Sequence, residues 1–212
     1  MTLKRLFCQP CRFFAELQDF SYVLPLVGLC ALSLLSEVVV LSKPGLDVVV
    51  RDVEALHPPG NVHGMALVLL VLAFKPILAL VDVLVWGVTL NFCLYLTVGV
   101  SSFREVFTIC CYAGYAREAL VFVLTVAARA YGEFAHLPLR ISTSAADFLS
   151  KAATSKLLYF LAGCLDAPWL CFLILVTIGV WKAVAGLPLR KAAIIVAAPG
   201  LIFAGLGFLA LY

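Results

Sequence analysis

Long apolar stretches alternate with short polar segments along the whole chain. The clearest case is the C-terminal part, where residues 157–181 carry Asp166 as their only charge and residues 192–212 carry none. A short basic turn, residues 182–191, separates the two stretches. About 20 apolar residues in a helix rise about 30 Å, which matches the hydrocarbon core of a bilayer. The pattern therefore predicts two membrane-spanning helices joined by a basic hairpin.

The same criterion, applied from end to end, predicts an all-α fold: a polytopic transmembrane helix bundle. Residues 64–100 are too long for one crossing, and we expect Lys75-Pro76 to divide them, because proline disfavours a helix interior. Shorter or amphipathic pieces predict helices that lie on the membrane surface. The five spans are expected at about residues 20–41, 76–98, 109–130, 165–184 and 192–212, and the surface helices at about residues 3–17, 64–74 and 145–160.

The first surface helix is predicted from the spacing of its apolar residues. Leucine and phenylalanine recur at intervals of three, four and seven, while the charged residues take the other side. Pro10 is expected to break or bend this helix. Between the second and third spans, residues 101–105 are expected to form a polar bend. Trp169 and Trp181 are expected near opposite membrane interfaces, because tryptophan prefers that position.

Composition narrows the class to a single membrane domain. Of the 212 residues, 64% are hydrophobic and 13% are charged, whereas soluble domains are about half apolar and about a quarter charged. The net charge of +3 comes from 15 cations and 12 anions. The cations stand at the edges of the predicted spans, so we expect the lipid bilayer, and not nucleic acid, as the partner. Other membrane proteins and self-association remain open as further partners.

Orientation follows from the placement of Lys and Arg. Five spans put the N-terminus, the second loop and the fourth loop on one side. The short basic fourth loop and the charge-free C-terminal stretch favour a cytoplasmic N-terminus in a bacterial inner membrane. The first apolar stretch is longer than the hydrophobic region of a signal peptide, so it is expected to stay in the mature chain.

Four charged residues fall inside the predicted spans: Asp82, Arg117, Glu118 and Asp166. Ionisable side chains are costly at that depth, and we expect them to face protein or water. Neighbours on a helix point about 100° apart, so Arg117 and Glu118 are not expected simply to cancel each other. Asp82 and Asp166 are the candidate partners for Arg117. The four form either a buried network that fixes helix register or part of a path for a substrate.

Two further charges border these spans. Lys75 stands seven residues, about two helical turns, before Asp82 and is a candidate partner for it. Glu37 lies near the end of the first span, where we expect it to reach the interface without a buried partner.

No motif for catalysis or for a cofactor is present. Cys8 and Cys11 form a C-x-x-C pair, but the sequence offers no second pair at ligand spacing. The three histidines, His57, His63 and His136, fall in predicted loops. We therefore expect a protein that is not an enzyme and holds neither a metal nor a cofactor.

Several short stretches resemble the Ypt-interacting protein (Yip) family in its short prokaryotic form, over nearly the whole chain. They are Pro10-Cys11-Arg12-Phe13-Phe14 followed by Leu24-Pro25-Leu26; Ser102-Phe103-Arg104-Glu105 with Tyr112; and Asp166, Gly179 and Gly186-Leu187-Pro188-Leu189-Arg190-Lys191-Ala192. The resemblance implies a five-span membrane protein without enzymatic activity.

Three departures from the family pattern limit which properties of the family the resemblance implies for this chain. Ala116 stands where eukaryotic members have a proline four residues after the tyrosine, Cys171 stands where a tryptophan is expected, and an acidic element before the first span is missing. In eukaryotes the family binds Rab-type GTPases and organises vesicle traffic. Because the supporting elements are absent, that GTPase role is not carried over to this chain.

Two functions remain open on the sequence. The first is a protein that organises the membrane or its partner proteins. The second is a small transporter or lipid-handling protein that uses Asp82, Arg117, Glu118 and Asp166 as an intramembrane polar pathway.

Overall fold

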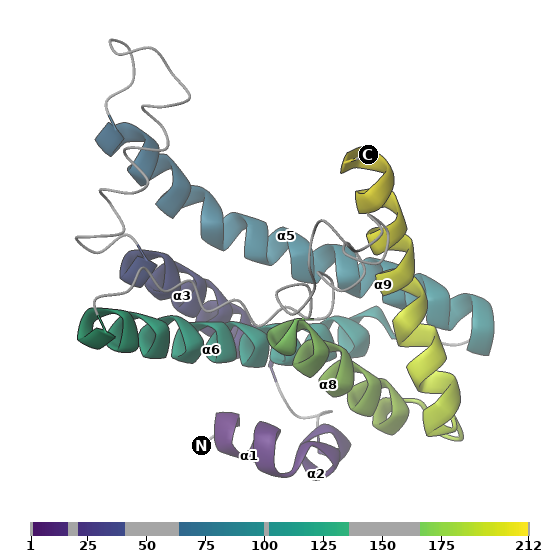
Figure 1. Ribbon diagram of the computed structural model, residues 1–212. Coiled ribbons are helices and arrows are strands. Elements are labelled where there is room, and N and C mark those ends of the chain that lie inside the picture. Colours follow the sequence, from purple (N-terminus) through teal and green to yellow (C-terminus); the bar gives the residue numbers. More distant parts are fainter. Residues whose placement is uncertain (1, 17–20, 41–63, 100–101, 136–165, 212) are drawn as a thin grey trace.

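Every regular element in the described part of the chain is an α-helix, which confirms the all-α part of the prediction. The computed structural model describes residues 2–16, 21–40, 64–99, 102–135 and 166–211 (Figure 1). The helices are α1 (Thr2–Cys8), α2 (Pro10–Ala15), α3 (Val23–Val40), α5 (Gly64–Val98), α6 (Phe103–Ala135), α8 (Ala167–Ala183) and α9 (Leu189–Leu211).

Helix α6 is the centre of the packing, because α3, α5 and α8 all lie against it. Its buried face combines Tyr112 with the small residues Ala113, Gly114 and Ala116. A Cβ atom on Gly114 would lie 2.8 Å from Leu29 of α3 and 2.8 Å from Val83 of α5. Small residues at such a crossing let the backbones of neighbouring helices approach closely. The absence of a side chain at Gly114 therefore sets the place where three helices meet.

Helix α5 runs without a break through Lys75-Pro76, so the predicted division at this point is wrong. Pro76 lies inside the helix, and the expected surface helix 64–74 is instead the first part of α5. Proline removes one backbone hydrogen bond and usually bends a helix. A full break in an apolar segment would leave several more backbone groups without partners, which costs more than tolerating one proline.

Helix α6 begins before the predicted third span and ends after it. Residues Phe103–Glu105 form its first turn and not the expected polar bend. Glu105 suits this position, because an acidic side chain in the first turn complements the positive end of the helix dipole. The other three apolar helices, α3, α8 and α9, fall within about three residues of the predicted spans.

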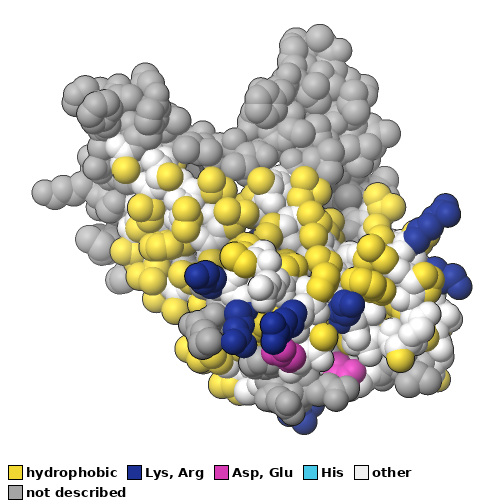
Figure 2. Space-filling view, turned by 90° about the horizontal axis from the view of Figure 1, so that it is seen from below, with side chains coloured by type: hydrophobic (Ala, Val, Ile, Leu, Met, Phe, Trp, Pro, Cys, Tyr) yellow, Lys and Arg dark blue, Asp and Glu magenta, His cyan; other side chains and the backbone are white. Residues whose placement is uncertain are grey.

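By length and composition, two helical segments are able to cross a membrane: Leu72–Val98 and Phe103–Ala128. Val23–Val39 and Ala167–Ala183 are shorter apolar helices. Many large apolar side chains point outward from these helices, among them Leu24, Phe92 and Leu96. Apolar side chains likewise cover a broad part of the surface in Figure 2.

The N-terminal segment forms two short helices, with the break at the predicted Pro10. Gln9 separates them, and Pro10 begins α2, a position where its missing N–H leaves no bond unmade. Leu6, Phe13 and Phe14 are buried, and α2 packs against α8. Seen in Figure 1, α1 and α2 lie below the longer helices. The amphipathic segment therefore docks its apolar side on the bundle.

The predicted surface helix 145–160 and the three histidines lie outside the described residues.

Candidate functional site

The structure brings Arg117 and Asp82 together across two helices. Arg117 Nη1 on α6 donates to Asp82 Oδ2 on α5 at 2.6 Å. The Arg117 side chain is 14% exposed, and that of Asp82 is 37% exposed. Asp82 is therefore the partner of Arg117 among the two that the sequence left open, and a carboxylate in an apolar helix has found its counter-ion in protein, as expected.

Glu118 also binds Arg117, so the two neighbours contact each other, and as expected they do not simply cancel, because Arg117 pairs with another helix as well. Arg117 Nη2 donates to Glu118 Oε1 at 3.1 Å, and the Glu118 side chain is 11% exposed. Cβ atoms of adjacent helical residues point about 100° apart, but the long guanidinium arm folds back far enough to close that gap. One cation thus holds two carboxylates, one from each of its Nη groups.

Two aromatic rings of α8 lie beside the guanidinium, and a ring of α5 packs against them. The Arg117 Cζ atom lies 5.6 Å from the ring centre of Trp169 and 5.5 Å from that of Phe172. Trp169 and Phe172 are stacked on each other, and Trp86 meets both edge-on. Such rings attract a cation through their negative faces. Trp169, which is half-buried in the first turn of α8, therefore contributes to the contacts between α5, α6 and α8.

Spacing along the helices carried a signal for this cluster. Trp86 stands four residues after Asp82, and Trp169 stands three residues before Phe172, so each pair shares one helix face. From the sequence, Trp169 was interpreted as a marker of a span end, without a connection to Arg117. Only the distance between helices makes that connection.

Asp166, the fourth predicted residue, is the N-cap of α8. Its backbone carbonyl accepts the N–H of Leu170 at 2.8 Å, and Pro168 lies in the first turn. The predicted start of this helix is therefore confirmed. Asp166 stands one turn before Trp169, and Arg117 forms ion pairs with Asp82 and Glu118. Asp166 thus marks the beginning of α8.

A second ion pair joins α5 to α3. Lys75 Nζ lies 3.3 Å from Glu37 Oε2, with the two side chains 47% and 17% exposed. Lys75, a candidate partner for Asp82, pairs with Glu37 instead, and its half-exposed side chain is not a buried partner for that carboxylate. The continuous course of α5 through Pro76 places Lys75 two turns from Asp82, on the same face.

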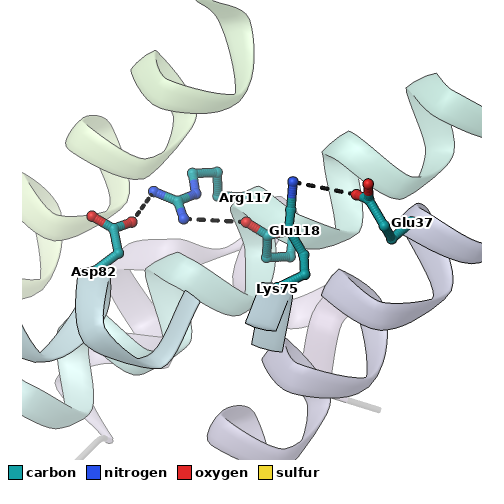
Figure 3. A network of polar contacts seen from close by, with 5 residues as sticks. All are labelled: Glu37, Lys75, Asp82, Arg117 and Glu118. Atoms are coloured by element: carbon teal, nitrogen blue, oxygen red, sulfur yellow. Dashed lines mark hydrogen bonds and ion pairs between the residues drawn. The ribbon is translucent and has the colours of Figure 1, made fainter. Parts of the chain in front are cut away.

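Together the two groups form a row of charges in one close-up view (Figure 3). Three carboxylates, Asp82, Glu118 and Glu37, face two cations, Arg117 and Lys75. The residues come from α3, α5 and α6, the three helices that pack on one another. Such a row fixes the register of the three helices. Each of the two pairs between helices, Arg117–Asp82 and Lys75–Glu37, forms only at one axial position of one helix against the other.

Two buried hydroxyls lie on the same helix as Glu37. Ser33 and Ser36 of α3 are buried, and their Oγ atoms have no hydrogen-bond partner in the described part of the chain. A buried hydroxyl without a partner costs free energy. Nothing in the sequence singles out these residues, because serine is common in apolar helices.

No group of three His, Cys, Asp or Glu side chains that could hold a metal ion is found among the described residues. Cys8 and Cys11 are exposed at the junction of α1 and α2, and Cys110 and Cys111 are buried in α6. The arrangement around Arg117 can bind charge and fix helices, and it presents no nucleophile next to a general base.

No family model, no curated protein and no solved structure matches this chain.

Proposed function

We propose that the chain is a five-span membrane protein of the Yip type, without enzymatic activity, that organises the bilayer or its partner membrane proteins. Its N-terminus lies in the cytoplasm of a bacterial cell, and its membrane is the inner membrane. Support comes from the distribution of polarity, from the packing of the Yip-like stretches and from the paired charges.

The distribution of polarity supports the membrane location. Arg117 and Glu118 lie inside the helix packing, while large apolar side chains such as Phe92 and Leu96 are more than half exposed. A protein folded in water favours the opposite arrangement, because exposing a broad apolar surface is costly there. In a bilayer the same arrangement is favourable, because lipid chains cover the apolar side chains.

Residues of the Yip-like stretches meet in one joint, which supports the resemblance. The rings of Phe13 and Tyr112 lie 4.9 Å apart, edge to face. Tyr112 donates its hydroxyl to the carbonyl of Ser21 at 3.4 Å, and Phe14 lies next to Gly179. Three stretches that are far apart in the sequence thus depend on one another for packing.

The same joint supports the proposed orientation. It gathers α2, the residue Ser21 just before α3, the first three turns of α6 and the end of α8. The N-terminus, the second loop and the fourth loop then share one side, which carries most of the described cations. Basic loops favour the cytoplasmic side of the membrane.

The paired charges favour an organising role over transport, since Arg117 is held by two carboxylates and lies beside two aromatic rings. A side chain held by four groups at once is suited to fixing helices and poorly suited to releasing and rebinding a solute.

One observation favours the alternative of transport. Asp82 is more than a third exposed, and the row has one carboxylate more than it has cations. A proton or a small cation would neutralise that excess.

Reconstitution into liposomes separates the two functions. Proton flux and lipid translocation are measured for the wild type and for Asp82→Asn, and vesicle shape is recorded by cryo-electron microscopy. The organiser predicts flux equal to that of empty vesicles for both proteins, together with altered vesicle shape or a reproducible membrane-protein neighbour in crosslinked cells. Flux that is lost in Asp82→Asn establishes transport. Vesicles of unchanged shape, together with crosslinked cells that yield no neighbour, refute the organising role.

A further inference from the structure

Most of the cations in the described part of the chain are concentrated on one face. These cations come from α1, α2, the start of α6, the end of α8 and the start of α9, and the described carboxylates among them are Glu16 and Glu105. Figure 2, seen from the side of α1 and α2, shows Lys and Arg side chains gathered there. We define this basic face by its seven cations: Lys4, Arg5, Arg12, Arg104, Lys182, Arg190 and Lys191.

A pocket of about 70 Å³ opens within the basic face, lined by Arg5, Gln9, Arg12, Phe13 and Glu16. This volume is larger than one water molecule needs. The break between α1 and α2 creates the pocket. The chain turns at Gln9, so that a guanidinium from each helix borders the same hollow.

The charges lining the pocket are only partly neutralised. Arg12 Nε donates to Glu16 Oε1 at 3.2 Å, in an exposed pair one helical turn apart. The Nη groups of Arg12 and the whole guanidinium of Arg5 have no ion-pair partner among the described residues. Gln9 adds an amide that can donate as well. The lining of the pocket thus contains two arginine side chains and one carboxylate, that of Glu16, and keeps an excess of positive charge.

Arginine recognises phosphate through two parallel N–H donors, which makes it the preferred side chain for such anions. Phe7, Tyr22 and Leu24, on α1 and at the start of α3, expose apolar surface. A ligand with an anionic head and an apolar tail matches both features. Basic clusters beside membrane helices attract anionic lipids in the same way.

We propose that this pocket binds the phosphate of an anionic glycerophospholipid in the leaflet that adjoins the basic face. The inference rests on the membrane location proposed above. It adds a ligand class and a place for it, which the organising role alone does not require. The lipid would tie α1 and α2 to the bilayer while Phe13 and Phe14 tie them to the bundle.

Thermal unfolding of the detergent-solubilised protein tests this proposal. Phosphatidylglycerol is added to one sample and phosphatidylcholine to another, and the lipids retained are counted by native mass spectrometry. We expect phosphatidylglycerol to raise Tm by several degrees over phosphatidylcholine, because a ligand of the folded state stabilises it by mass action. High salt should reduce this difference.

The double variant Arg5→Gln/Arg12→Gln should lose the phosphatidylglycerol effect and the retained lipid, with its Tm in phosphatidylcholine unchanged. Arg190→Gln/Lys191→Gln removes the same charge outside the pocket and should keep both. An equal loss in the two variants would show diffuse attraction to the basic face and refute the pocket. A Tm increase with sodium phosphate as large as that with the lipid would refute the lipid as the source.

The membrane location is tested on its own by cell fractionation. A chain that stays in solution without detergent overturns the location and this inference together. A chain that fractionates with the membrane but shows no preference for phosphatidylglycerol overturns this inference alone.

Discussion

Arg117 Nη1 lies 2.6 Å from Asp82 Oδ2, across a separation of 35 residues in the chain. This contact joins α5 to α6, and the second Nη group of the same guanidinium holds Glu118. Because the rings of Trp169 and Phe172 lie beside the Arg117 guanidinium, α8 also depends on the position of this side chain. One residue thus links three helices.

Replacing Arg117 by glutamine should lower the free energy of unfolding by about 3 kcal/mol, because Asp82 and Glu118 then face each other without a counter-ion. That value is at the low end for a broken buried pair, since Asp82 is partly exposed. Thermal unfolding in detergent measures the change. Arg12→Gln, which breaks the exposed pair with Glu16, should cost under about 0.5 kcal/mol. Equal losses in the two variants would contradict the role assigned to Arg117.

Neutralising the whole cluster tests the same point from the other direction. The triple variant Asp82→Asn/Arg117→Gln/Glu118→Gln should be more stable than Arg117→Gln alone, because it leaves no unpaired carboxylate. Size-exclusion profiles and Tm in one detergent make the comparison. A triple variant less stable than the single one would show that packing, and not charge, decides the loss.

Gly179 of α8 leaves no room for a side chain. A Cβ atom there would lie 2.5 Å from Ile109 Cγ2 and 3.2 Å from Phe14 Cδ1. Gly179→Ala should therefore destabilise the protein by about 1–3 kcal/mol through overpacking. Gly200→Ala in α9 is the matched control, because its Cβ atom would meet Trp86 at an ordinary 3.6 Å. That change should be neutral or stabilising by up to about 1 kcal/mol, as alanine favours helix.

The two glycine variants are thus expected to differ in Tm, with Gly179→Ala below the wild type and Gly200→Ala at or above it. A Gly179→Ala protein with unchanged Tm would mean that α2 and α6 do not press on α8 at this point.

Gly186, in the turn between α8 and α9, has a φ of +79°. A β-branched side chain strongly disfavours this left-handed region, and Gly186→Val should cost about 1–2 kcal/mol. Gly186→Asn should keep most of the stability, because asparagine tolerates positive φ. Since no atom lies within 4 Å of the position that a Cβ would take, crowding plays no part. Equal Tm values for the two variants would argue against a conformational cause.

Phe13 fixes the N-terminal helices to the bundle through Tyr112. Phe13→Ala should release α1 and α2, since replacing a buried phenylalanine by alanine costs about 3–5 kcal/mol. Limited trypsin digestion reports the release as faster cleavage after Lys4, Arg5 and Arg12. Phe7→Ala is the control, because Phe7 is 44% exposed. Cleavage at the wild-type rate in Phe13→Ala would show that other contacts hold the segment.

Features that depend on neighbouring residues were predictable from the sequence. The apolar stretches predicted α3, α8 and α9 to within a few residues, and Pro10 and Asp166 marked where helices begin. These signals are local, because helix length, proline geometry and hydropathy act within a few turns of the chain. The inward position of the charges was predictable too, since an ionised side chain is costly against lipid.

Which carboxylate pairs with each buried or half-buried cation was decided only by the tertiary structure. Arg117 had two candidate carboxylates on other helices, and only the crossing of α5 and α6 selects Asp82. The helix continues through Pro76, since a full break would leave more backbone groups without partners than one proline does. That continuity places Lys75 beside Glu37. Each of these outcomes depends on distances between segments far apart in the chain, which hydropathy and spacing along one helix do not contain.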